Sequence, residues 1–181
     1  MILKCKLLIV ACGIIFVGAT SNAGNLSLYS FTEGAADEGM PNLSSGDENV
    51  AIGDEALKSN TIGSNNTAIG DEALKSNTTG AKNTAVGKDA LHSNTSGQQN
   101  VAVGYEALEK NTSGQKNVAI GSEAGNSNTS GIQNTAVGSE ALKANTTGNR
   151  NTALGESSLK LNSNGYEHTG IGVYSLDANT S

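Results

Sequence analysis

The sequence has few of the residues that normally build a globular core. Its 181 residues include no Trp, two Phe, four Tyr and one Pro, whereas Gly occurs 23 times. A conventional globular domain is therefore disfavoured, because too few large side chains are available to fill its interior. Intrinsic disorder is the first alternative, since low hydrophobicity with excess charge favours it. The order of the residues argues against disorder, because they repeat.

Positive charge and cysteine are also scarce. The 11 Lys and Arg are outnumbered by 17 Asp and Glu, which gives a net charge of −6. We expect no nucleic-acid partner, because phosphate contacts need clustered Lys and Arg. Cys5 and Cys12 lie close to the N-terminus. If that segment is removed, the mature chain has no disulfide to stabilise it.

Residues 1–23 have the pattern of an export signal peptide. Two lysines precede the apolar residues 7–19, a stretch too short to span a bilayer comfortably. Small residues then predict cleavage after Ala23. Two alternatives stay open: lipoprotein processing at Cys12, and an uncleaved anchor helix. We expect an exported chain that, once mature, does not itself span a membrane.

A 17-residue repeat organises the rest of the chain. Asn recurs every 17 residues from Asn49 to Asn151, and His168 takes the eighth place. A glycine follows four residues later in every copy, from Gly53 to Gly172. The unit reads N-[TV]-A-[IVL]-G-x-x-A-L-x-x-N-T-x-G-x-x, and its positions are numbered 1 to 17 below. Repetition at a fixed period is the signature of stacked-coil architectures.

The unit reads as short strands joined by turns. Residues 49–53 predict a strand that ends at glycine, and residues 55–57 predict a second strand. The Asn-Thr-x-Gly stretch predicts a turn. A helix over residues 54–58 is set aside, because it would span barely one turn between glycines. Residues 49–181 are therefore predicted to form an all-β, parallel β-roll or β-solenoid of 17-residue coils, each with two short strands and two turns.

Residues 24–48 precede the regular copies. We expect residues 24–31 to form a loose leader. Residues 32–48 align with the next unit, with Gly46 over Gly63, although the Asn and strand positions are lost. We interpret them as a degenerate N-terminal cap coil, since terminal repeats of solenoids are usually atypical.

Stacked coils would turn each repeated position into a row of like side chains. Residues 50 and 52 point to one side of the strand and residue 51 to the other. Both sides are apolar, so one can form the coil interior and the other needs a partner chain. A homo-oligomer with its axis along the rod satisfies this. The candidate apolar ladder, which serves either as core ridge or as oligomer interface, comprises Ile52, Ile69, Val86, Val103, Ile120, Val137, Leu154 and Ile171. A second row begins at Leu57 and is interrupted by Gly125.

Two polar rows are also candidate sites. The turn ladder comprises Asn60, Asn77, Asn94, Asn111, Asn128 and Asn145. It could bind a polar ligand, but capping of the turn backbone and stacking of amides are favoured. The threonines that follow, from Thr61 to Thr146, could order water as ice-binding solenoids do. We expect them on a turn and not on a flat strand, which disfavours that function.

Charged and aromatic residues suggest weaker sites. The acidic residues at position 7 could bind Ca²⁺, but a solvated surface partly neutralised by lysines is favoured. His92 and His168 have no cysteine or evident ligand set nearby, so no metal site is assigned. No unique catalytic trio interrupts the repeat, and we expect neither an enzyme nor a cofactor. Tyr166, His168 and Tyr174 suggest either a ligand patch or, preferably, a degraded cap.

Residues 49–181 resemble the head repeats of trimeric autotransporter adhesins, the YadA-like head. The segments most similar to the family core are residues 49–53 and 117–121. The resemblance implies a left-handed parallel β-roll, intertwined as a homotrimer, at the bacterial surface or outer membrane or secreted. It also implies adhesion to a host or extracellular-matrix surface component.

The chain departs from this family in two respects. Its 17-residue unit is longer than the family's common unit, and it shows neither coiled-coil heptads nor the alternation of barrel strands, which suggests a truncated gene or a secreted head. Similar repeats occur in phage tail-fibre-like proteins. A structural rod or spacer is therefore the alternative function, and an ice-binding solenoid comes third.

Overall fold

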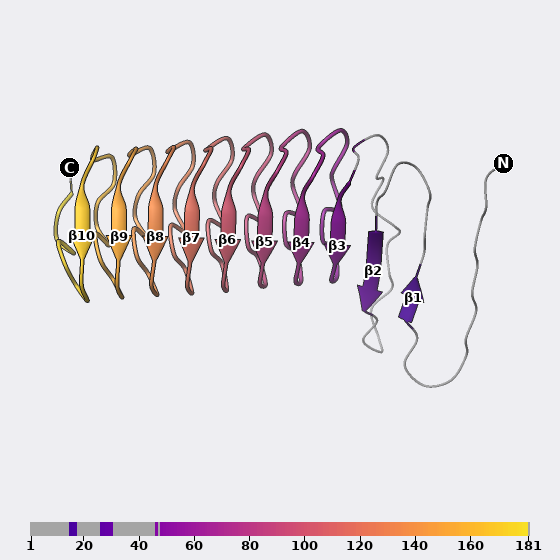
Figure 1. The fold of residues 1–181 in the computed structure, drawn as a ribbon, viewed down its shortest axis with the longest axis horizontal. Helices are drawn as coiled ribbons and strands as arrows, with labels where there is room; N and C mark the ends of the chain where they lie inside the picture. The colour runs from indigo at the N-terminus through magenta and orange to yellow at the C-terminus, as the bar shows by residue number, and fades with distance from the viewer. Residues whose placement is uncertain (1–14, 18–25, 31–45, 47, 181) are drawn as a thin grey trace.

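The computed structural model describes residues 15–17, 26–30, 46 and 48–180, and these residues form a β-solenoid (Figure 1). Short strands lie side by side in chain order within one sheet. The strands are β1 (Ile15–Val17), β2 (Leu26–Ser30), β3 (Val50–Ile52), β4 (Thr67–Ile69), β5 (Thr84–Val86), β6 (Val101–Val103), β7 (Val118–Ile120), β8 (Thr135–Val137), β9 (Thr152–Leu154) and β10 (Thr169–Ile171). The predicted all-β solenoid of 17-residue coils is confirmed, and the described residues contain no helix.

Strands β3 to β10 are parallel and paired at an offset of one repeat. Ala102 in β6 pairs with Ala119 in β7, and the other strands keep the same 17-residue register. Because the offset equals the repeat length, equivalent side chains lie directly above one another. The rows expected from the sequence are therefore present in the structure.

Two further strands precede the regular coils. β2 pairs in parallel with β3, and β1 pairs antiparallel with β2. The expected leader thus contributes the strand β2 to the sheet. Gly46 lies against Gly63, as the expected alignment requires, since a Cβ built on Gly46 would collide with the carbonyl oxygen of Gly63. Apart from β1, β2, Gly46 and Glu48, the predicted signal peptide and cap coil lie outside the described residues. In the part of the chain that the structure describes, no helix has the length and apolar character to cross a membrane.

The segment after each strand is a run of tight turns. In the first coil the N–H groups of Ala56, Lys58 and Asn60 donate to carbonyls three residues back, at 3.4, 3.1 and 3.1 Å. The N–H of Leu57 instead donates to a carbonyl of the next coil at 3.0 Å. Glu55 and Leu57 have φ angles of 51° and 55°, in the left-handed region, which is incompatible with an extended strand. The prediction of a second strand at residues 55–57 is therefore wrong.

Glycine at position 5 satisfies two separate requirements. Gly104 has a φ of 135°, which side-chain-bearing residues rarely adopt. A Cβ built on Gly104 would also lie 2.5 Å from the carbonyl oxygen of Gly121 in the next coil. The chain can therefore turn after the strand, and stack closely, only where this side chain is absent.

The interior is narrow and holds three apolar side chains per regular coil. They are the Ala in the middle of the strand at position 3, the Ala at position 8 and the Leu at position 9, and nearly all are fully buried. The buried core comprises Ala51, Ala56, Leu57, Ala68, Ala73, Leu74, Ala85, Ala90, Leu91, Ala102, Ala107, Leu108, Ala119, Ala124, Ala136, Ala141, Leu142, Ala153 and Leu159. Small residues at two of the three inward positions allow the two sides of each coil to approach closely.

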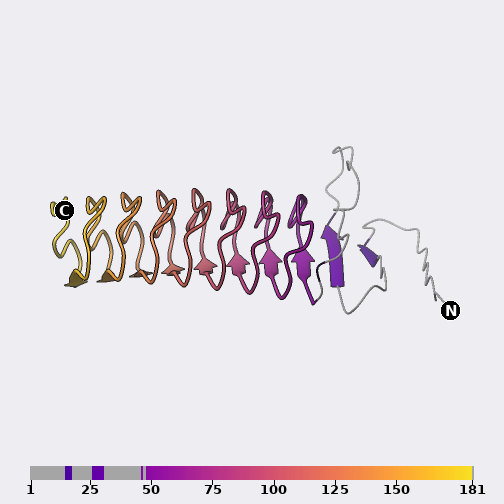
Figure 2. The same cartoon turned by 90° about the horizontal axis from the view of Figure 1, so that it is seen from above.

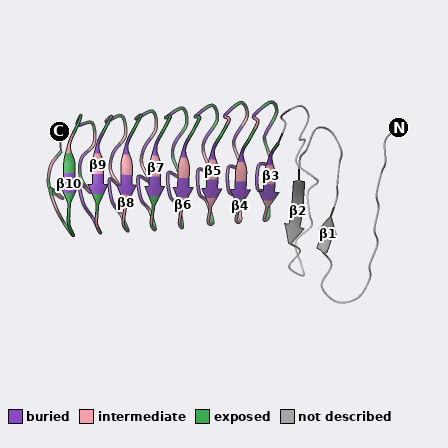
Figure 3. Ribbon diagram, viewed as in Figure 1, coloured by how far each residue is buried: buried purple, intermediate pink, exposed green. Residues whose placement is uncertain are grey.

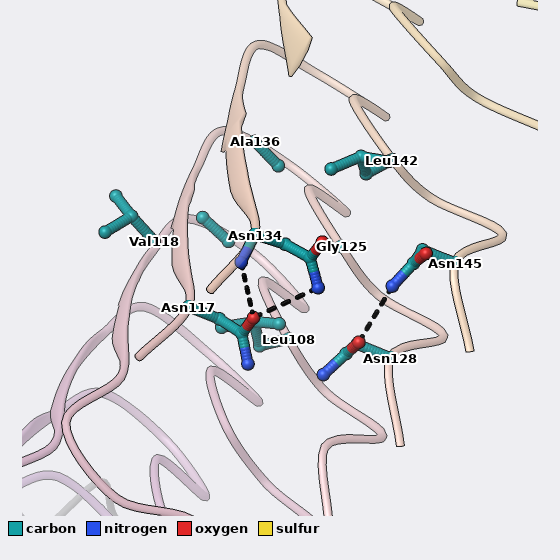
Figure 4. Close-up of a pocket in the computed structure, with 10 residues that line it drawn as sticks. Leu108, Asn117, Val118, Gly125, Asn128, Asn134, Ala136, Leu142 and Asn145 are labelled. Atoms are coloured by element: carbon teal, nitrogen blue, oxygen red, sulfur yellow. Dashed lines mark hydrogen bonds between the residues drawn. The ribbon is translucent and has the colours of Figure 1, made fainter. Parts of the chain in front are cut away.

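The leucine row is interrupted at Gly125, where the interior is incompletely filled (Figure 4). Gly125 lies between Leu108 and Leu142 in the row, and a cavity of about 10 Å³ adjoins all three residues. The φ of Gly125 is 59°, close to the 50–55° of the leucines of the row. The backbone at this point is therefore already in the conformation that leucine adopts in the neighbouring coils.

Replacing Gly125 with Leu is expected to stabilise the chain. A buried Leu contributes about 1.5–3 kcal/mol, and a left-handed residue with a side chain costs about 1–2 kcal/mol. The new Cβ would lie 3.1 Å from Leu108 Cδ2, the mobile tip of a side chain that can adjust. We expect the melting temperature, followed by circular dichroism, to rise by roughly 2–6 °C.

Gly125→Ala is the matched control, because it imposes the same backbone penalty while filling little of the cavity. It should leave the melting temperature unchanged or lower it. An equal rise in both variants would contradict the assignment of the gain to cavity filling.

Candidate functional site

The outer face of the sheet carries a continuous apolar row. In each of β3 to β10 the middle residue is buried and its two neighbours are half-buried or exposed; Figure 3 colours the ribbon by burial. Because side chains alternate along a strand, the two neighbours face the outer side. Ile69, Ile120 and Leu154, all from the candidate apolar ladder, are 37%, 41% and 37% exposed although they lie within the rod. The candidate ladder therefore lies on the outside of the coil, and alanines take the inside.

A second outward row adjoins the apolar ladder. Position 2 is Val or Thr in every coil, and Val118 points away from the interior in Figure 4. Positions 2 and 4 together form a strip that we call the strand face. The strand face lies along one side of the rod, and the turns lie on the opposite side (Figure 2).

The turn ladder is buried, and its side-chain amides bond to one another and to backbone carbonyls. Asn94 Nδ2 donates to Asn77 Oδ1 at 2.8 Å and to the carbonyl of Gly97 at 3.2 Å. Asn94 Oδ1 accepts from Asn111 Nδ2 at 2.8 Å. All six candidate asparagines, from Asn60 to Asn145, are buried. Their amides therefore hold successive coils together and are not available to a ligand from solvent.

The asparagines at position 1 form a second buried ladder. Asn100 Nδ2 donates to Asn83 Oδ1 at 3.1 Å and to the carbonyl of Gly114 at 2.8 Å. Asn100 Oδ1 accepts from the backbone N–H and the Nδ2 of Asn117, at 3.0 and 3.2 Å. Figure 4 shows one step of each ladder beside the cavity. Each coil is therefore tied to the next by two rows of amides.

The threonine row at position 13 bonds to the backbone. Thr78 Oγ1 donates to the carbonyl of Thr95 at 2.9 Å, and Thr95 Oγ1 donates to that of Thr112 at 3.1 Å. These hydroxyl protons point along the rod into the next coil. The geometry therefore gives no support to a row of free hydroxyls that would order ice-like water.

Lysines at position 10 bridge the acidic groups of two successive coils. Lys75 Nζ lies 2.5 Å from Glu55 Oε2 and 3.1 Å from Glu72 Oε1. The hydrogen bond with Glu55 raises the pKa of Lys75 above its ordinary value, and the bonds from Lys58 and Lys75 lower the pKa of Glu55. The acidic row is thus an ion-paired surface wherever lysine occupies position 10.

The same arrangement recurs near the C-terminal end of the row. Lys143 Nζ lies 2.5 Å from Glu123 Oε2 and 2.7 Å from Glu140 Oε1, and Lys160 pairs with the other oxygen of Glu140. The hydrogen bonds from Lys143 and Lys160 lower the pKa of Glu140 to about 2. Glu140 is therefore the carboxylate held most strongly in its ionised form by this network.

The lysine row is broken in the middle of the rod, and the break brings together residues that the sequence prediction kept apart. His92 occupies position 10 of the third coil. Its Nε2 lies 3.0 Å from Glu72 Oε2, and ligand atoms of Glu72, Asp89 and His92 all lie within 4.8 Å of one another. The replacement of lysine by histidine in the row was the signal that could have identified this group.

The residues of the suggested C-terminal patch are not joined by hydrogen bonds. His168 Nδ1 lies 3.2 Å from Asn162 Oδ1 and 3.0 Å from Asn179 Nδ2, so the imidazole takes the place of asparagine at the half-buried C-terminal end of the amide network. Tyr166 and Tyr174 are both exposed. His168 therefore bonds to asparagines of the ladder and not to the tyrosines of the suggested patch.

Comparison of the chain with protein-family models, curated proteins and solved structures gives no match. The strand face, the amide ladders and the broken lysine row are therefore the features from which function can be argued.

Replacing Asn100 with Ala is expected to destabilise the rod strongly. The substitution leaves the buried N–H of Asn117 without its partner, at about 1–3 kcal/mol, and it removes the other side-chain bonds of Asn100, including one of the two that the carbonyl of Gly114 accepts. We expect a loss of about 2–5 kcal/mol in the free energy of unfolding, measured by urea titration. Gln98→Ala, at an exposed position of the preceding coil, should change it by less than about 0.5 kcal/mol. Equal effects would contradict the assigned role of the ladder.

The ion pairs of Glu140 predict a pH dependence. The pKa of Glu140 is lowered from 4.5 to about 2, so the carboxylate stabilises the fold above pH 4.5, and this contribution disappears as the pH falls towards 2. Glu140→Gln should therefore melt roughly 2–4 °C lower at pH 7 and converge with the unsubstituted chain near pH 2. Glu156→Gln is the control, because Glu156 is exposed and forms no ion pair among the described residues. A Glu140→Gln difference that persists at pH 2 would contradict this account.

Proposed function

We propose that this chain is the head of an exported bacterial surface adhesin, which assembles as a homotrimer and attaches to host or matrix surfaces through many weak contacts. The observation that carries the proposal is the outward apolar row of the strand face. The row runs through eight coils without a polar residue.

The strand face needs a partner that follows the rod over its whole length. The interior of each coil is occupied by its own alanines and leucine, so the Ile, Val and Leu side chains at position 4 cannot turn inward. A straight line of exposed aliphatic groups is unfavourable in water and is typical of an interaction surface. A second copy of the same rod presents a row of the same spacing, which makes self-association the simplest way to cover it.

A symmetry axis parallel to the rod covers every coil equally. Rotation about such an axis brings the strand faces of all copies towards the centre and leaves their turns outside. The number three follows from the resemblance to the YadA-like head. In this assembly the charged and amide-bearing turns form the outer surface.

Adhesion would use the variable turn positions. Positions 16 and 17 carry different polar residues from coil to coil, such as Gln98, Gln99, Gln115 and Lys116, and these four are exposed. Three chains would present each of them three times on one particle. Contacts that are individually weak then add up through high effective concentration.

Export fits the way in which the coils are held together. Cys5 and Cys12 belong to the predicted signal segment, so the mature chain has no disulfide. The two buried amide ladders and the bridging lysines link each coil to the next without any redox chemistry. The stability of such a fold would not depend on disulfide formation in the compartment that it reaches.

The assembly is tested by substitutions on the strand face. We expect the unsubstituted chain to sediment as a trimer. Val103→Lys combined with Ile120→Lys should yield monomers with an unchanged circular dichroism spectrum, because both side chains point outward and three aligned lysine pairs would repel one another. Gln115→Lys, which adds the same charge on a turn, should remain trimeric. A folded monomer of the unsubstituted chain at all concentrations would remove the trimer from the proposal.

Adhesion requires a separate measurement. Binding of the trimer to a panel of immobilised matrix proteins and host cells should exceed that of an unrelated solenoid. The monomeric variant should bind at least about 100-fold more weakly if avidity operates. A trimer that binds nothing on the panel would replace the adhesin with a structural rod or spacer.

A further inference from the structure

We propose that Glu72, Asp89 and His92 form a binding site for a divalent transition-metal ion, with Zn²⁺ as the ion of reference. Glu72 follows β4, whereas Asp89 and His92 follow β5 (Figure 1). The site would therefore join two successive coils. It is separate from the strand face and does not depend on the proposed adhesion.

The geometry of the three side chains suits a small cation. His92 Nε2 and Glu72 Oε2 are 3.0 Å apart, and one carboxylate oxygen of Asp89 lies within 4.8 Å of both partners' ligand atoms. Ligands at about 2.1 Å from a tetrahedral Zn²⁺ lie roughly 3.4 Å from one another. Small rotations of the side chains, without movement of the backbone, would therefore place all three around one ion.

The donor set is the kind that transition metals prefer. One imidazole nitrogen and two carboxylates are ligands for Zn²⁺ and its neighbours, and a protein site with three ligands leaves a fourth position for water. All three residues are half-buried. An ion there would be accessible from solvent yet partly shielded from it.

A second contact of the imidazole supports the assignment. When Nε2 binds a metal, the proton of a neutral imidazole resides on Nδ1. In this structure His92 Nδ1 lies 3.4 Å from Ser93 Oγ, an oxygen that can accept that proton. Hydrogen bonds of this kind orient histidine ligands in established metal sites.

The Asp89 carboxylate has no ion-pair partner among the described residues. The position 7 carboxylates of the two preceding coils, Glu55 and Glu72, are paired with lysines, whereas no hydrogen bond to the Asp89 carboxylate occurs within residues 48–180. Burial and the nearby Glu72 charge raise its pKa above the ordinary value, although Lys88 and His92 act in the opposite direction. Lys88 itself pairs with Asp71 at 2.8 Å. A dication would supply the missing positive charge.

The existing partners of Glu72 leave one of its oxygens for the ion. Lys75 contacts Glu72 Oε1 at 3.1 Å, and His92 contacts Oε2. The ion would replace the proton between His92 and Oε2 while Lys75 keeps its place. On the other side, Glu109 follows His92 in the row and is held by Asn126 Nδ2 at 2.8 Å. No lysine therefore competes at position 10 of the next coil.

A metal ion at this point would stabilise the rod. It would bind the stacked coils and not the unfolded chain, so its binding free energy would add to that of folding. The ion would link Glu72 of the second coil to Asp89 and His92 of the third. It would serve as a cross-link between coils in a repeat region that has no cysteine to form a disulfide.

The test measures Zn²⁺ binding to the full chain without an affinity tag. Isothermal titration calorimetry should give one Zn²⁺ per chain, and Co²⁺ used as a probe should give the visible absorption of a protein-bound ion. His92→Lys introduces the lysine that four other coils carry at position 10, and it should preserve folding while weakening Zn²⁺ binding by more than about 100-fold. Asp89→Asn should also weaken it.

The control removes the other histidine. His168→Asn restores the asparagine of the other coils, and it should bind Zn²⁺ as the unsubstituted chain does. The proposal is overturned if the unsubstituted chain takes up no stoichiometric Zn²⁺. It is also overturned if folded His92→Lys binds Zn²⁺ with the same affinity, since the ion would then be attracted by the acidic surface in general.

Discussion

Hydrogen bonding between identical buried asparagines of successive coils is the interaction on which the rest of the structure depends. Asn83 Oδ1 accepts both the backbone N–H and the Nδ2 of Asn100, at 3.0 and 3.1 Å. Two such bonds form only if the chain returns to the same place after each lap, so the ladder demands a constant repeat length. The interior holds mainly alanine and one leucine per regular coil. Because this apolar core is so small, the amides account for a large share of the specificity for one stacking register.

The close stacking that the ladders require explains the unusual backbone. Left-handed residues other than glycine occur at positions 7, 9 and 17, with Gly125 as the exception at position 9, and Glu106, Leu108 and Gln99 illustrate them with φ of 54°, 51° and 58°. Such residues are unfavourable in isolation. They persist here because the N–H groups that they orient are satisfied within the coil or by its neighbours, as for Leu108, which donates to the carbonyl of Ala124 at 3.0 Å.

The sequence allowed the stacking and the rows to be predicted, because the 17-residue period is visible in residue identity alone. The second strand at residues 55–57 was predicted wrongly, because Glu-Ala-Leu has no glycine to signal the left-handed angles at Glu55 and Leu57. The capping role of the asparagines could be expected from their place in a turn, but their complete burial could not, since asparagine is usually exposed.

The group of Glu72, Asp89 and His92 was missed because its members are neighbours across coils. In this fold residues 17 and 20 positions apart can be in direct contact, as His92 Nε2 and Glu72 Oε2 are at 3.0 Å, and searches along the chain overlook them.

Interruptions of the rows carry more information than the rows themselves. A regular row repeats one chemistry in every coil and cannot define a single site. Where a row inside the rod changes, at Gly125, the result is a cavity of about 10 Å³, and the loss falls on stability alone. Where a row on the surface changes, at His92, no packing is lost. The group that faces Glu72 and Asp89 becomes an imidazole instead of an ammonium. An ammonium can only donate hydrogen bonds, whereas an imidazole can also bind a metal ion. A solenoid can therefore acquire new chemistry on its outer rows at little risk to its fold, whereas its inner rows are constrained by contacts on both sides.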